Sequence, residues 1–130
     1  VKALLELETR SRGKVIIRKL VNLKHTHRTA NDFPAGREYR IFIHNKSILA
    51  YGYYWDTQDT LNDADKKEIE RLGLEVANRI DVPYLAVDVG QLESDQWIVI
   101  EVGDSQFAGF SKVEPLVLWN KLNKEIENGS

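Results

Sequence analysis

The 130-residue sequence contains no cysteine and no methionine, which excludes disulfide bonds and thiolate metal sites. It has no apolar run near the roughly 20 residues that a membrane-spanning helix needs. Acidic and basic residues nearly balance, 20 against 18, so the net charge of −2 offers no basic surface for nucleic acid or anionic membranes. We therefore expect a cytoplasmic protein with no membrane and no nucleic-acid partner.

Glycine-rich phosphate-binding patterns are also missing, because neither G-x-G-x-x-G nor G-x-x-x-x-G-K-[ST] occurs. No repeat or linker divides the chain, so residues 1–130 are expected to form a single domain. The start at Val1-Lys2 and the absence of methionine suggest a fragment of a longer protein.

Residues 83–111 carry the main pattern in the sequence. Two β-favouring runs, 84–89 and 97–102, flank the polar run GQLESDQ and predict an antiparallel hairpin. Alternation places Glu101 on one face with Trp97 and Val99. If Ser94 and Asp95 are the central turn residues, Asp88 lies directly opposite Glu101.

Two facing carboxylates repel each other and should destabilise a sheet. A divalent cation would reverse this effect, because Mg²⁺ prefers carboxylate oxygens. Asp104, in the following turn, is placed to supply a third oxygen. The hypothesis is a metal site at Asp88, Glu101 and Asp104.

A second hairpin is predicted at 38–44 and 47–55, with its turn at Asn45-Lys46. Alternation puts Arg40 on a face with Glu38 and Phe42, in the middle of an apolar strand where an unpaired cation is costly. A guanidinium suits phosphate or carboxylate, since its planar fork donates two parallel hydrogen bonds. Two roles are therefore open at this stage, a phosphate contact or a structural ion pair with Asp88 or Glu101.

The other segments predict an α+β fold. A helix-forming stretch at 1–12, a strand at 14–23 and a surface loop at 24–37 precede the hairpins. Helices are predicted at 62–80, capped by Asn62, and from Pro115 onward. The architecture is an antiparallel sheet with helices packed on one face, the face of Tyr39, Ile41, Ile43, Leu85, Val87, Ile98 and Ile100. The opposite face would carry Arg40, Asp88 and Glu101.

The runs EYRIFIHNKSILAYGYY (38–54) and VDVGQLESDQWIVIEVGDSQFAGFS (87–111) resemble the C-terminal, larger subdomain of the ATP-grasp domain family. The resemblance implies that Arg40 is catalytic and contacts the transferring phosphoryl group. It also implies that Asp88, Glu101 and Asp104 hold Mg²⁺, and that the hinge residues Arg18, Lys19, Leu20 and Val21 line the adenine of ATP. The commoner pattern has Asn two residues after the Glu; here Gly103 stands at that position and Asp104 follows, which suggests a divergent clade.

The resemblance implies an ATP- and magnesium-dependent ligase domain, which activates a carboxylate as an acylphosphate for attack by an amine or another nucleophile. The partners would be a nucleotide, a small-molecule or peptide carboxylate, and the missing smaller ATP-grasp subdomain, in the parent chain or a second protein. Without that subdomain the chain should be inactive alone. Two alternatives remain: a non-catalytic interaction module that retains the fold, and a divalent-metal hydrolase.

Overall fold

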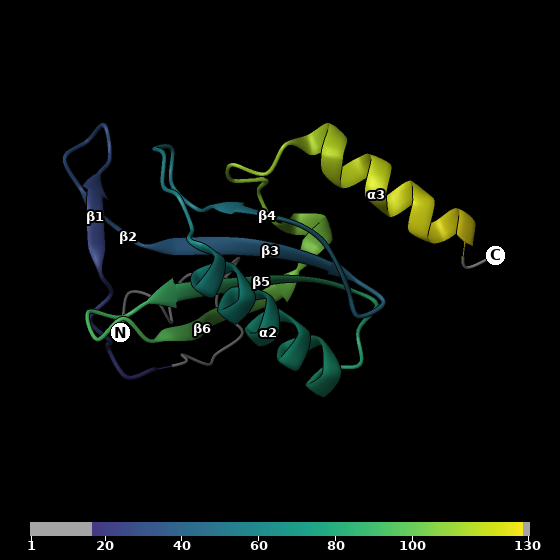
Figure 1. The fold of residues 1–130 in the computed structure, drawn as a ribbon, viewed down its shortest axis with the longest axis horizontal. Helices are drawn as coiled ribbons and strands as arrows, with labels where there is room; N and C mark the ends of the chain where they lie inside the picture. The colour runs from purple at the N-terminus through teal and green to yellow at the C-terminus, as the bar shows by residue number, and fades with distance from the viewer. Residues whose placement is uncertain (1–16, 129–130) are drawn as a thin grey trace, which may run out of the picture.

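The structure, a computed structural model, describes residues 17–128. Its centre is a four-stranded antiparallel sheet in the order β4-β3-β5-β6 (Figure 1). The strands are β3 (Glu38–His44), β4 (Ser47–Tyr53), β5 (Tyr84–Gln91) and β6 (Trp97–Asp104). Two α-helices, α2 (Asp63–Arg79) and α3 (Pro115–Asn128), pack on this sheet. The predicted α+β class with an antiparallel sheet is confirmed.

The hairpin of β3 and β4 forms where it was predicted. Its two turn residues, Asn45 and Lys46, have φ values of 44° and 66°. Two successive positive φ values belong to the tight turn whose twist matches that of paired strands. Beyond this turn Leu49 is an extra residue in β4, and the shifted register pairs Arg40 with Gly52 on β4, while Asp88 on β5 is its partner on the other side.

Helix α2 covers one face of the sheet. Asn62 caps it by accepting a hydrogen bond from the Asp65 N–H at 2.8 Å. Ile69 and Ala77 of the helix are fully buried against Ile41 and Val87 of the sheet. The predicted helix, its cap and its apolar stripe are all confirmed.

Helix α3 packs elsewhere than predicted. Its buried residues Leu118 and Leu122 contact Phe42 and Ala86, which alternation places on the sheet face opposite α2. The backbone before α3 can approach β4 because residue 52 is a glycine. An added Cβ at Gly52 would lie only 2.6 Å from the Val113 nitrogen. The prediction that both helices share one face is therefore wrong for α3, and part of the second face is covered.

The hairpin of β5 and β6 has the predicted strands but a different turn. The Asp95 N–H donates to the Leu92 carbonyl at 2.9 Å, so Glu93 and Ser94 are the central residues. The register then shifts between Val89 and Asp88, and Ile100 is the extra residue of a β-bulge. The bulge restores the predicted pairing of Asp88 with Glu101.

The same bulge corrects the predicted faces of β6. Trp97 lies in the core under α2, not on the face of Glu101. Ile98 was expected under α2, but it pairs with Gly90 on the same face as Asp88. Ile100 also packs there, 3.1 Å from the position of a Cβ at Gly90. A single extra residue thus reverses the alternation along this strand.

Residues 17–37 differ from their prediction. Residues 17–22 form no regular strand, and Leu23 makes only an isolated bridge to Leu92. The expected loop instead contains a small hairpin, β1 (His25–Arg28) and β2 (Pro34–Gly36). The predicted helical stretch at 1–12 and the start of the 14–23 strand lie outside the described residues. Between residues 17 and 128, neither helix has the length and apolar composition that crossing a membrane requires.

Candidate functional site

Arg40 and Asp88 form a two-pronged ion pair on the sheet face away from α2. The Arg40 Nε donates to Asp88 Oδ1 at 2.8 Å, and Nη2 donates to Oδ2 at 2.7 Å. The side chains are 14% and 8% exposed, so the pair is largely removed from solvent. The hydrogen bonds with Asp88 raise the pKa of Arg40 above its usual value. Arg40 and Asp88 lie on one face of the sheet, as predicted. Of the two roles predicted for Arg40, the structural ion pair with Asp88 is the one seen in the structure.

The guanidinium of Arg40 makes two further contacts. Its Nη1 donates to the Gly109 carbonyl at 2.9 Å, and its carbon lies 4.8 Å from the centre of the Tyr54 ring. Three of the five N–H groups of an arginine are then used within the described part of the chain. An anion in the cleft would bind through the other two N–H groups.

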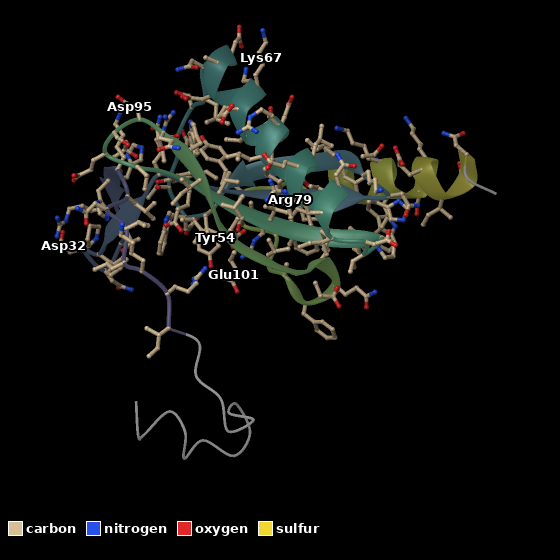
Figure 2. All side chains as sticks on the ribbon, turned by 90° about the horizontal axis from the view of Figure 1, so that it is seen from below. Asp32, Tyr54, Lys67, Arg79, Asp95 and Glu101 are labelled. Carbon is tan, nitrogen blue, oxygen red and sulfur yellow. The ribbon has the colours of Figure 1, made fainter. Side chains whose placement is uncertain are left out.

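Glu101 and Asp104 border the same cleft, which has a volume of about 280 Å³. Glu101 points away from the sheet on the side opposite α2 (Figure 2), and within residues 17–128 it makes no hydrogen bond or ion pair. The Asp104 carboxylate accepts the Gln106 N–H at 2.8 Å and caps the short 3-10 helix η1 (Ser105–Phe107). Arg40, Asp88, Glu101 and Asp104 therefore all line one cavity.

The three acids nevertheless do not form a compact cluster. Across the described ranges, no group of three or more histidine, cysteine or acidic residues is close enough to hold a metal ion. The donor chemistry still fits Mg²⁺, because Glu101 has both oxygens available and Asp88 keeps lone pairs beyond those used by Arg40. The metal assignment of Asp88, Glu101 and Asp104 stays a prediction.

The predicted adenine-binding residues lie beside β6. Arg18, Lys19, Leu20 and Val21 line a groove of about 460 Å³ together with Ile98, Val99 and Ile100. Arg18 donates to the Ile100 carbonyl, which directly precedes Glu101 in the chain. The groove and the carboxylate cleft are thus lined by successive residues of the edge strand β6. The adenine role of residues 18–21 also stays a prediction.

Glu38 is a site residue that was not predicted from the sequence. Its Oε1 accepts the indole N–H of Trp55 at 3.0 Å. Burial raises the pKa of Glu38 above its usual value of 4.5, and the charge of Asp88 raises it further, while the Trp55 hydrogen bond acts in the opposite direction. The available signal was alternation, which put Glu38 on the face of Arg40.

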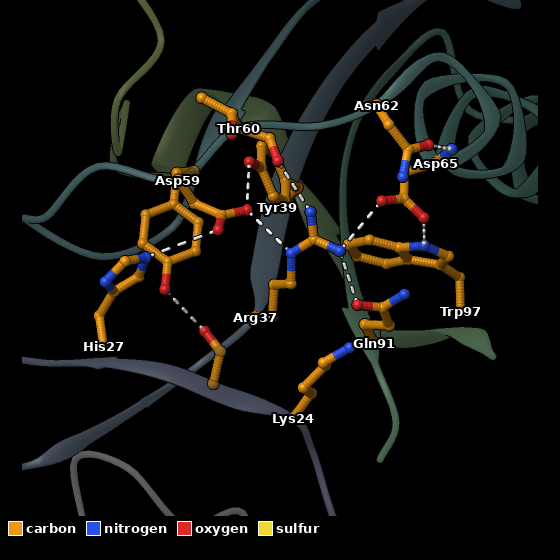
Figure 3. Close-up of polar contacts among 12 residues, drawn as sticks. Lys24, His27, Arg37, Tyr39, Asp59, Thr60, Asn62, Asp65, Gln91 and Trp97 are labelled. Carbon is orange, nitrogen blue, oxygen red and sulfur yellow. Dashed lines mark hydrogen bonds and ion pairs between the residues drawn. The ribbon is translucent and has the colours of Figure 1, made fainter. Parts of the chain in front are cut away.

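A second polar cluster lies on the other face and is structural (Figure 3). Arg37, only 12% exposed, donates to Asp59 at 3.0 Å, to Asp65 at 3.0 Å and to Gln91 at 2.6 Å. It also stacks on Trp97, with 5.4 Å between the guanidinium carbon and the ring centre. With the Nη2 bond to the Thr60 carbonyl at 2.8 Å, four of its five N–H groups are used within the described residues, which is the pattern of a structural arginine.

A family model described as "ATP-grasp domain, R2K clade family 3" matches residues 3–122, which is most of the chain. A search of curated proteins gave no significant match. The matched range includes the carboxylate cleft, the groove beside β6 and both hairpins of the main sheet.

Proposed function

Because the chain belongs to R2K clade family 3 of the ATP-grasp domains, we propose that it is the larger part of an ATP- and magnesium-dependent ligase. Its reaction would be activation of a carboxylate as an acylphosphate, followed by attack of an amine or another nucleophile. The observation that carries the proposal is the convergence of Arg40, Asp88 and Glu101 on one cleft beside an open groove. We place this chemistry in the cytoplasm, where ATP is abundant.

Each residue has a distinct role in this proposal. Arg40 donates to the transferring phosphoryl group and keeps its orientation through Asp88 and the Gly109 carbonyl. Residues 18–21 contact the adenine in the groove along β6. Along β6, the groove comes before the carboxylates. A nucleotide with its base in the groove would therefore extend its phosphates toward the carboxylates.

Magnesium would be held by Asp88 and Glu101, with Asp104 as a third oxygen donor. When bound, Mg²⁺ neutralises charge on the phosphate oxygens and aligns them for transfer. Asp88 would then serve two cations at once, with Arg40 on one side of its carboxylate. The chain's own contribution is to fix Arg40 and Asp88 in a largely buried pair so that little reorganisation is needed.

The cleft is open, so a further part must cover the phosphates during catalysis. We propose that this part is the smaller ATP-grasp subdomain, supplied by the parent chain or by a partner protein. The described chain alone should then bind nucleotide weakly and not turn it over.

Thermal unfolding with and without nucleotide tests the proposal. Mg²⁺ with ADP or ATP at about one hundred times its dissociation constant should stabilise the fold by about 2.7 kcal/mol. For a domain of this size the melting temperature should rise by about 10 °C. Nucleotide without Mg²⁺, or with a chelator, should give a much smaller rise.

Two variants sharpen this test. Glu101→Gln should abolish the Mg²⁺-dependent rise in melting temperature. It should change the stability of the unliganded protein by less than about 0.5 kcal/mol, because Glu101 is exposed. Gly103→Asn should increase the Mg²⁺-dependent rise, because a side chain there meets no atom within 4 Å and restores the commoner family pattern beside Glu101. An equal rise in wild type and Glu101→Gln, or no rise at all, would refute the site.

A second function is favoured by one observation. Both Asp88 oxygens already accept from Arg40, and in the described residues the acids form no metal-binding cluster. A non-catalytic interaction module that retains the fold would have the same Arg40–Asp88 pair and the same spread of acids. It should show no Mg²⁺-dependent nucleotide stabilisation in any variant.

A further inference from the structure

A separate cavity of about 400 Å³ lies between residues 20–23 and the β1–β2 hairpin. We call it the acceptor cavity. Two aromatic rings, Phe33 and Trp55, stand 5.7 Å apart on one side. Its remaining lining is mostly apolar, with His25 and the two carboxylates Glu38 and Glu93. Among the described residues that line it there is no lysine or arginine, so its formal charge is negative.

Glu38 is fixed in this cavity by two contacts. Trp55 donates to its Oε1 at 3.0 Å. The carboxylate also lies against the backbone of Gly36, where an added Cβ would be only 2.5 Å from Oε1. A glycine at 36 is therefore needed for the Glu38 carboxylate to take this position. Its second oxygen, Oε2, makes no hydrogen bond within residues 17–128.

The acceptor cavity adjoins the carboxylate cleft. Glu38 and Arg40 are alternate residues of β3 and share a face, and their partners on β5 are Gly90 and Asp88. Asp88 is close enough for its charge to raise the pKa of Glu38. Leu20 and Val21 separate the acceptor cavity from the groove along β6 and line both. A molecule bound at Glu38 would thus lie two residues along β3 from Arg40, on the same face of the sheet.

We propose that the acceptor cavity binds the nucleophile of the ligase, a primary amine carried on an apolar group, and that Glu38 takes its proton. This inference rests on the proposed function. Two lining carboxylates, with no lysine or arginine among the described lining residues, favour an ammonium over an anion. The apolar lining fits the hydrocarbon part of such a molecule.

The ammonium gives one proton to the Glu38 carboxylate and becomes a neutral amine. Its lone pair attacks the acyl carbon, a C–N bond forms, and the C–O bond to phosphate breaks with its electron pair leaving on the phosphate. The second nitrogen proton goes to that phosphate, and Glu38 returns its proton to solvent. A raised pKa suits Glu38 to this transfer.

Nuclear magnetic resonance of the Trp55 indole N–H, assigned with Trp55→Phe, provides a direct test in the absence of nucleotide. Hexylamine should move this resonance in a saturable way, whereas hexanoate of equal length should not. Glu38→Gln keeps an oxygen acceptor for Trp55 but should weaken hexylamine roughly tenfold, the effect of one charge-assisted hydrogen bond. Phe33→Leu, at an exposed ring, should weaken it without touching the core.

The matched control is Glu127→Gln on the exposed end of α3, which should bind hexylamine like wild type. Equal binding of hexanoate, unchanged hexylamine binding in Glu38→Gln, or adenosine binding in place of hexylamine would overturn the inference. Loss of amine binding with intact Mg²⁺–ADP stabilisation would overturn this inference alone. Amine binding with no nucleotide stabilisation would instead overturn the proposed function and the acceptor role with it.

Discussion

At the scale of single residues, the pairing of Arg40 with Asp88 changes what a charge deletion should do. From the sequence, Asp88 and Glu101 were equivalent facing carboxylates, so removing either charge would relieve repulsion. In the structure Asp88 is neutralised by a largely buried guanidinium, and Glu101 is exposed. The two acids therefore have opposite roles in the stability of the unliganded protein.

Asp88→Asn should lower the free energy of unfolding by about 3 kcal/mol, because it leaves Arg40 without its counterion in a poorly solvated place. Glu101→Gln should be neutral or slightly stabilising. Urea denaturation of both variants without ligand measures the difference. Equal effects of the two substitutions would mean that the ion pair is not formed in solution.

Glu38 predicts a pH dependence of stability. A carboxyl group with a raised pKa binds its proton more tightly in the folded state, so its contribution is full below pH 4.5 and is lost as pH rises through the raised pKa. Glu38→Gln removes this dependence. Denaturation at pH 4, 5.5 and 7 should show the variant gaining on wild type as pH rises; a constant difference would show that Glu38 is not buried as described.

At the scale of elements, regular patterns could be predicted and compensating irregularities could not. The turn at Asn45-Lys46, the cap at Asn62 and the stripe of α2 follow from local chemistry, and the structure confirms them. In β6, the turn and the Ile100 bulge each shift the register by one residue, and the shifts cancel at Glu101. The pairing of Asp88 with Glu101 was therefore right, although the faces of Trp97 and Ile100 were wrong.

The N-terminal part of the described chain shows a different limit. Residues 14–23 have the composition of a strand. Whether such a run pairs depends on where it lies relative to an unpaired sheet edge, and the sequence alone does not reveal this. Residues 24–37 lack periodicity, yet β1 and β2 form around a short turn with Asp32 at a φ of 59°. The groove residues 18–21 and the acceptor cavity depend on this tertiary placement, so the sequence alone could not show that they adjoin.

At the scale of the whole molecule, Arg37 connects segments that are far apart in the chain. It joins the start of β3 to the link that carries Asp59, to the first turn of α2 at Asp65 and to the end of β5 at Gln91 (Figure 3). Tyr39 adds a hydrogen bond to Asp59 at 2.7 Å. The position of α2 on the sheet depends on this cluster.

Arg37→Met should destabilise the whole fold by about 3–5 kcal/mol, because two largely buried carboxylates lose their counterion. Arg37→Lys should not restore it, since one ammonium cannot reproduce the fork of donors. Arg71→Met, on the exposed face of α2, is the control and should have little effect. Chemical denaturation compares all three; a small loss in Arg37→Met would show that the cluster is dispensable.

The bulge at Ile100 has one more consequence, for how copies of the protein behave together. β6 is the last strand of the sheet, and a flat outer strand is a template for pairing with another molecule. The extra residue bends this edge strand, and Arg18 donates a hydrogen bond to its Ile100 carbonyl. We therefore expect the irregularity that places Glu101 opposite Asp88 also to disfavour self-association into extended sheets.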